Sequence, residues 1–111
     1  MDIQQNLRLS LLIDFYGSLL TEKQRDTLVS FLDKNISLSE LAQMQSTTRQ
    51  AINDIVKRTI NLLEDYESKL HLLTKFETIK HCVANCLQIS DGNDQKSKKI
   101  AEQLNKIMEV L

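Results

Sequence analysis

SLSELAQMQSTTRQAINDIVKR, residues 37–58, predicts a short helix, a tight polar turn and a second helix that continues past Arg58. This order is typical of a helix-turn-helix, whose second helix can lie in a DNA major groove. A helix-turn-helix is therefore the core of the predicted fold.

The apolar residues of this stretch have the spacing that two crossing helices need. Leu41 and Ala42 give the first helix an apolar and then a small side chain where the second helix must pass closely. Ile52 and Ile55 are three residues apart, so they share one face of the second helix and can pack on Leu41. These four residues form the predicted motif core.

Donor-rich side chains occupy the outward positions of the second helix. Thr48 is the predicted N-cap, because its hydroxyl can accept a hydrogen bond from a free N–H of the first turn. Between residues 49 and 61, three basic residues and one acidic residue, Asp54, leave a net charge of +2. The alternative interpretation is an ordinary solvated helix face. The predicted nucleic-acid-binding residues, which suit base edges and phosphates, are Thr48, Arg49, Gln50, Asn53, Lys57 and Arg58.

Two features of the sequence argue against DNA contact. Such motifs favour Gly in the turn with apolar neighbours, whereas this chain has Gln45, Ser46 and Thr47. The whole protein is also weakly acidic, with a formal net charge of −1, so a nucleic-acid site must be a local patch. Beyond that patch, the acidic run at 64–67 is predicted to face water.

Length and composition predict one all-α domain of about five to six helices. The chain has 111 residues, no Pro and only two Gly, and it lacks strand-type runs. The helix-turn-helix core is expected at about 20–63 and a C-terminal helical tail at about 77–111. The most apolar stretch, 7–20, is too short to span a bilayer, and no signal peptide precedes it. A soluble cytoplasmic protein without membrane insertion is expected.

Helical periodicity and capping signals divide the chain further. Thr21 and Ser37 each begin a capping-box sequence, and Gly17 is expected to end the first helix in a left-handed conformation. The second helix of the motif is predicted to run from 49 to about 73, with a weakly marked break near 74–75. The first helix has an apolar stripe at Ile3, Leu7, Leu11, Leu12 and Phe15, widened by Leu9 and Ile13. The last helix, 95–111, is predicted to turn inward Ile100, Ala101, Leu104, Ile107, Met108 and Leu111.

Metal, cofactor and enzymatic chemistry find little support. Cys82 and Cys86 are four residues apart on a predicted helix, so reduced thiols that behave as small buried apolar residues are expected. With His71 and His81 they match no common zinc spacing. No nucleophile elbow, phosphate-binding Gly loop or HExxH motif is present, so we predict no enzyme, no metal and no cofactor.

Four ordered blocks carry a family resemblance. They are DFYGSLLTEKQR (14–25), ISLSELA (36–42), RQAINDIVKRT (49–59) and LEDYESKL (63–70). Over roughly residues 7–76 the chain resembles the YlxM-type family of small bacterial helix-turn-helix proteins. The stretch from about 20 to 63 also resembles region 4 of bacterial sigma factors. Relative to the YlxM-type family, Ser46 replaces Gly, Thr48 replaces a Ser N-cap and Asn53 replaces Tyr.

The resemblance implies a DNA-binding or regulatory protein of the signal recognition particle pathway. On this hypothesis Arg49, Gln50 and Asn53 contact bases, whereas Lys57 and Arg58 hold phosphates, with DNA favoured over RNA. A second hypothesis is a protein-interaction module that uses the helix-turn-helix only as scaffold. A third is a homodimer through the long helix and the C-terminal helices, which would bury Leu62, Tyr66, Leu70 and Leu73.

Overall fold

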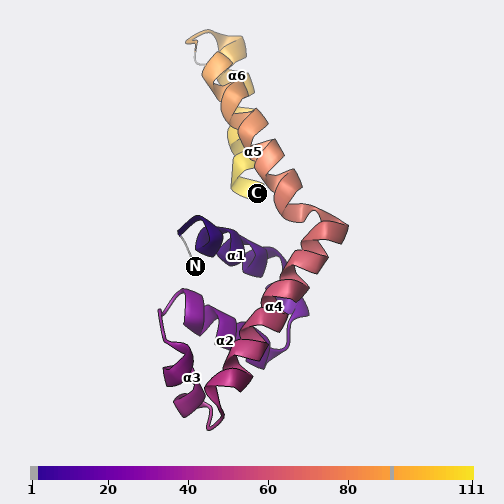
Figure 1. Ribbon diagram of the computed structural model, residues 1–111. Coiled ribbons are helices and arrows are strands. Elements are labelled where there is room, and N and C mark those ends of the chain that lie inside the picture. Colours follow the sequence, from indigo (N-terminus) through magenta and orange to yellow (C-terminus); the bar gives the residue numbers. More distant parts are fainter. Residues whose placement is uncertain (1–2, 91) are drawn as a thin grey trace. The chain divides into compact units, whose positions relative to one another are not determined.

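The computed structural model describes residues 3–90 and 92–111 and is all-α over this part of the chain (Figure 1). This confirms the predicted fold class. Two compact units divide the chain, Met1–His71 and Leu72–Leu111, and each is described separately below. The elements are α1 (Ile3–Tyr16), the 3-10 helix η1 (Gly17–Leu19), α2 (Glu22–Leu32), α3 (Leu38–Met44), α4 (Arg49–Leu70), α5 (Leu72–Ile89) and α6 (Gln95–Val110).

The first unit is built around α4, the longest helix of the described chain. α1, α2 and α3 all pack against it (Figure 1). The buried side of α4 follows helical spacing, so one continuous stripe meets all three neighbours. That stripe consists of Ile52, Val56, Thr59, Leu63 and Glu67.

The buried face of α1 differs from the predicted stripe. Ile3 and Leu7 are 79% and 60% exposed, whereas Tyr16, which the prediction left out, is 1% exposed. The helix is apolar on two sides, so periodicity alone could not select the side that meets the rest of the unit. The residues of α1 that are buried are Leu9, Leu12, Ile13 and Tyr16.

Gly17 does not have the predicted left-handed conformation, because no glycine of the described chain has a positive φ angle. It is the first residue of η1 and is buried. A Cβ atom at this position would lie 3.3 Å from Ile13 Cγ2 and 3.6 Å from Arg25 Nε. Gly17 therefore serves close packing rather than an unusual backbone angle.

The predicted starts of α2, α3 and α4 are confirmed. The Thr21 Oγ1 accepts from the Gln24 N–H and the Thr21 N–H donates to Gln24 Oε1, which completes a capping box before α2. Ser37 Oγ accepts from the Glu40 N–H at the start of α3, where only this half of the box is formed. Thr48 Oγ1 accepts from the N–H of Ala51 at 3.1 Å and caps α4 as predicted.

The long helix ends earlier than predicted. α4 stops at Leu70, and His71 has φ 57° and ψ 29°, a left-handed conformation that breaks the helix. The predicted continuation to residue 73 and the break at 74–75 were therefore wrong by a few residues. No Gly or Pro marks this end, so the sequence carried no local signal for it.

The second unit is a hairpin of two helices, α5 and α6, that pack on each other. Asp94 caps α6. Its hydrogen bonds with Ser97, above all the one with the Ser97 side chain, hold the pKa of its carboxyl below the usual value. Leu73 and Val83 are buried on α5, but α6 has no buried residue. The inward set predicted for α6 is thus only partly covered: Ile100, Ile107 and Leu111 are exposed, and Ala101, Leu104 and Met108 are half-buried.

Cys82 and Cys86 are free thiols, as predicted, but both are exposed, so their expected burial was wrong. None of the described helices combines the length and apolar content needed to cross a membrane.

Candidate nucleic-acid interface

The turn between α3 and α4 forms without glycine. Ser46 takes the left-handed conformation, with φ 53°. The Thr47 N–H donates to the Ala42 carbonyl at 2.9 Å, and the Ser46 N–H donates to the Gln43 carbonyl at 3.2 Å. These two bonds are the six-to-one and five-to-two pair of a Schellman motif, which ends α3 sharply. The polar turn therefore has the tight geometry that the sequence left in doubt.

Gln45, which stands where an apolar residue is usual, has a polar partner. Its Nε2 donates to Thr27 Oγ1 of α2 at 2.9 Å, and Thr27 is only 1% exposed. Buried polar groups cost free energy unless they are hydrogen-bonded, so this bond offsets the cost of burying the Gln45 amide and the Thr27 hydroxyl. The bond ties the turn to α2, although Gln45 Oε1 is buried without a partner.

Replacing Ser46 with Gly is expected to raise the free energy of unfolding by about 0.5–1 kcal/mol. A left-handed conformation costs a non-glycine residue roughly 1–2 kcal/mol, and only part of this is offset by the greater freedom of Gly in the unfolded chain. Urea denaturation of the two variants measures the difference. Ser46→Ala is the matched control, since it keeps the Cβ atom and should bring no gain; a Gly variant that is less stable than the parent would contradict the prediction.

The predicted motif core is mostly buried. Leu41, Ala42 and Ile52 are 2%, 6% and 0% exposed. Ile55 is only half-buried, and Val56, one residue later, takes the buried position. The buried face of α4 is therefore rotated slightly from the predicted face, because α1 and α2 contact this helix as well as α3.

The predicted contact residues lie along the outer side of the first half of α4. Arg49, Gln50, Lys57 and Arg58 are exposed, and Asn53 is half-buried. Arg49, Gln50 and Asn53 line one shallow recess together with Leu38 of α3. Lys57 and Arg58 lie two turns further along the helix. The structure thus brings the predicted base-contacting residues together and leaves the two phosphate-contacting residues separate from the recess.

Gln50 and Asp54 form a pair on this face. Gln50 Nε2 donates to Asp54 Oδ1 at 3.0 Å, one helical turn away. This bond holds the Gln50 amide along the helix and keeps a carboxylate beside the basic residues. A carboxylate there repels phosphates but can accept from the amino group of cytosine.

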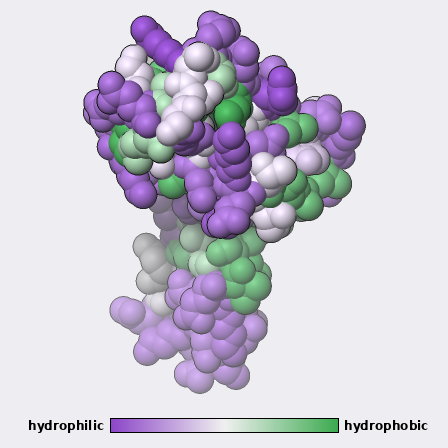
Figure 2. Space-filling view, turned by 90° about the horizontal axis from the view of Figure 1, so that it is seen from below, coloured by the Kyte–Doolittle hydropathy of each residue, from purple (hydrophilic) through white to green (hydrophobic). Residues whose placement is uncertain are grey.

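The face that contains α3 and the start of α4 is largely hydrophilic. Figure 2 views the protein from the end at which these elements lie in Figure 1, and polar surface dominates its nearest part, with separate hydrophobic patches. A polar surface with local positive charge is typical of nucleic-acid contact, whereas a protein-docking surface is usually more apolar at its centre.

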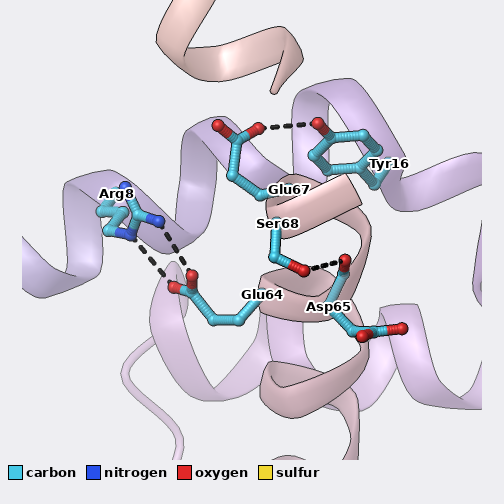
Figure 3. A network of polar contacts seen from close by, with 6 residues as sticks. All are labelled: Arg8, Tyr16, Glu64, Asp65, Glu67 and Ser68. Atoms are coloured by element: carbon cyan, nitrogen blue, oxygen red, sulfur yellow. Dashed lines mark hydrogen bonds and ion pairs between the residues drawn. The ribbon is translucent and has the colours of Figure 1, made fainter. Parts of the chain in front are cut away.

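One side of the second half of α4 packs against α1. Arg8 of α1 forms a bidentate ion pair with Glu64, with Nε to Oε1 at 3.0 Å and Nη2 to Oε2 at 2.8 Å (Figure 3). The Tyr16 hydroxyl donates to Glu67 Oε1 at 2.6 Å. Glu67 is 5% exposed, so the prediction that the acidic run faces water was wrong for this residue. Asp65 pairs with Lys69 at 3.0 Å on the exposed side.

These contacts explain most of the length of α4 without a second protein chain. Tyr66 is half-buried and its ring lies 5.9 Å from that of Tyr16, while Leu63 is fully buried. Sequence reasoning missed Arg8, Tyr16 and Thr27, because none of them belongs to a motif. The spacing of Tyr16 after Leu9 and Leu12 was the one signal that could have placed it in the core.

Comparison with known proteins places the whole arrangement in one family. The family model UPF0122, described as “Putative helix-turn-helix protein, YlxM / p13 like”, matches residues 3–107. A UPF0122 protein of Clostridium kluyveri is 42% identical over 105 residues, which cover 95% of this chain and 93% of the relative. A UPF0122 protein of Staphylococcus haemolyticus is 41% identical over 109 residues, covering 98% and 96%. The match extends through α5 and most of α6, so the expected limit of the resemblance near residue 76 was wrong.

Proposed function

The chain belongs to the UPF0122 family of YlxM/p13-like helix-turn-helix proteins, and from this premise we propose that it is a regulatory protein that binds nucleic acid through α3 and α4. Family membership makes nucleic-acid binding plausible, and the description of the family names no enzymatic reaction. We assign the contacts to residues of α4, the target to duplex DNA and the process to protein targeting.

The observation that carries the proposal is the Schellman turn at Ser46. This turn ends α3 and starts α4 at Arg49, so that the first half of α4 projects its polar side into solvent. Arg49, Gln50 and Asn53 share one recess at that end. In helix-turn-helix proteins the N-terminal residues of the second helix contact base edges, which is the role we assign to these three side chains.

Lys57 and Arg58 have the role of phosphate contacts. Both are exposed and neither takes part in an ion pair among residues 3–90 and 92–111. Phosphate contacts fix the register of a protein on the duplex without reading its sequence. We propose DNA rather than RNA as the target, because the major groove of B-DNA admits an α-helix and the deep, narrow groove of A-form RNA does not.

The process we propose is protein targeting by the signal recognition particle. The support is the YlxM-type resemblance, which implies a partner among the components of that particle. A regulatory protein with few phosphate contacts would bind reversibly, which suits a role in controlling the level or assembly of these components.

The test is a titration of fluorescent duplex DNA, duplex RNA and the RNA of the particle with the full chain. With two phosphate contacts, the affinity is expected to fall about tenfold between roughly 50 mM and 200 mM salt. Affinity for duplex DNA should exceed affinity for duplex RNA of the same sequence. Absence of binding to all three nucleic acids at low salt would refute the proposal.

The second candidate function is protein interaction, with the helix-turn-helix as scaffold. The observation that favours it is the set of exposed apolar side chains on the second unit, including Ile79 and Ile107. The two candidates are distinguished by an Arg49→Ala, Lys57→Ala variant. Loss of nucleic-acid binding with intact association to targeting-pathway proteins supports the first; unchanged behaviour in both assays supports the second.

A further inference from the structure

One face of the α5–α6 hairpin carries an apolar stripe on each helix. On α5 the stripe has the spacing three, four, three and consists of Ile79, Cys82, Cys86 and Ile89, all exposed. On α6 the same spacing gives Ile100, Ile107 and Val110, with the polar Gln103 between them, and all four are exposed. A three–four repeat keeps side chains on one seam along a helix, which is the pattern of helices that pack in coiled coils and bundles.

The two stripes meet in a groove. Its lining is mostly apolar and consists of Ile79, Gln103, Lys106, Ile107, Val110 and Leu111. Ile79 and Ile107 are each 43% exposed and Val110 is 86% exposed. All of these residues belong to the second unit, so the groove is a feature of the hairpin itself.

The hairpin is too small to bury its apolar side chains alone. Of its residues that the structure describes, only Leu73 and Val83 are buried. Units of about 40 residues rarely hold a sufficient core without disulfides, metals or association. Two antiparallel helices with a free apolar face are half of a four-helix bundle, whose core forms between the facing helices.

The charges of α6 indicate what completes the bundle. Lys99, Glu102, Lys106 and Glu109 alternate in sign, and each precedes a residue of the exposed stripe of α6, so that they flank this stripe. In the described part of the chain none of these four side chains has an ion-pair partner. Read backwards, the order plus, minus, plus, minus becomes minus, plus, minus, plus, so an antiparallel copy presents the opposite sign at each position.

A second α6 in antiparallel orientation would therefore oppose each charge with the opposite sign. If the two-fold axis crosses α6 at the level of residue 104, Lys99 lies opposite Glu109 of the partner subunit. Glu102 then lies opposite Lys106 of the partner subunit. A parallel arrangement would oppose like charges at every position. Self-complementarity of this kind is the requirement for an isologous dimer interface, and an unrelated partner would have no reason to match it.

We propose that a second copy of this chain covers the apolar face of the α5–α6 hairpin, with the two α6 helices antiparallel. Lys99 then pairs with Glu109 of the partner subunit, and Glu102 pairs with Lys106 of the partner subunit. Ile100, Ile107 and Val110 become buried at the centre of a four-helix bundle. The site is independent of the nucleic-acid surface on α3 and α4.

Sedimentation of the full chain at micromolar concentration tests this proposal. The parent protein is expected to be a dimer, and Ile107→Glu to raise the dissociation constant about 100-fold or more, because two carboxylates enter an apolar seam. Ile3→Glu is the matched control, since Ile3 is 79% exposed on α1 and should leave the dimer intact. A parent chain that stays monomeric, whether or not it binds another protein or a lipid vesicle, overturns the proposal.

A charge swap tests the orientation without disturbing the core. Lys99→Glu alone and Glu109→Lys alone are each expected to weaken the dimer about three- to tenfold, because like charges then face each other. The double variant restores the opposite signs and should recover the parent affinity. Lys23→Glu on α2 controls for net charge and should have no effect. Single variants that weaken the dimer without recovery in the double variant overturn the antiparallel register.

Discussion

The Tyr16→Ala variant is expected to unfold with a free energy about 3–5 kcal/mol lower than that of the parent chain, the usual cost of deleting a large buried aromatic side chain. Tyr16 is 1% exposed, its ring lies 5.9 Å from that of Tyr66, and its hydroxyl donates to Glu67 at 2.6 Å. Removal of the ring opens a cavity between α1 and α4 and takes a donor from a buried carboxylate. Because domains are stable by only about 5–15 kcal/mol, this variant should be close to unfolding at physiological temperature.

The Tyr16→Phe variant separates the two effects. It keeps the ring and removes only the hydroxyl, so it should cost about 1.5–3 kcal/mol, the range for a hydrogen bond to a charged group. Ile3→Ala, at an exposed position of the same helix, should change stability by no more than about 0.5 kcal/mol. Urea denaturation followed by far-ultraviolet circular dichroism measures all three. Equal stability of the Ala variant and the parent would contradict the docking of α1 on α4.

The triple variant Arg49→Ala, Lys57→Ala, Arg58→Ala is expected to lower affinity for duplex DNA about 100-fold or more at low salt. It removes one proposed base contact and two proposed phosphate contacts, and each phosphate contact also contributes about one unit to the salt slope. The logarithmic dependence of affinity on salt should therefore flatten together with the loss of binding. All three side chains are exposed, so the fold should not change.

Two further variants on the same helix serve as controls. Lys69→Ala removes a lysine that pairs with Asp65, far along α4 from the recess, and should change affinity less than about twofold. Asp54→Asn removes the carboxylate beside the basic residues and should raise affinity about three- to tenfold, because less repulsion opposes the phosphates. If Lys69→Ala weakens binding as much as the triple variant, the binding surface is not the first half of α4.

The local features of this protein could be predicted because their determinants lie within a few residues of each other. A cap such as Thr21 or Thr48 accepts a hydrogen bond from a residue three positions later, so its signal is complete in the sequence. The helix-turn-helix was predictable for the same reason, since Leu41, Ala42 and Ile52 form its core across one short turn. The turn itself was left in doubt, because Ser is not a residue type that indicates the left-handed conformation that Ser46 adopts.

The site was predictable to a similar extent. Arg49, Gln50, Lys57 and Arg58 are exposed in the first half of α4, as predicted. The pairing of Gln50 with Asp54 follows from helical spacing but was not predicted.

The sequence by itself thus determined the helices, most of their caps, the class of the fold and the family, because helical periodicity and short-range hydrogen bonds are written in neighbouring residues. Only the tertiary structure decided which side of α1 is buried, that Glu67 is a core carboxylate bonded to Tyr16, and that Gly17 serves close packing. Each of these depends on partners 4 to 51 residues away or on a competition between two apolar faces. These features follow from contacts between helices across the whole unit, and such contacts cannot be predicted from local sequence patterns.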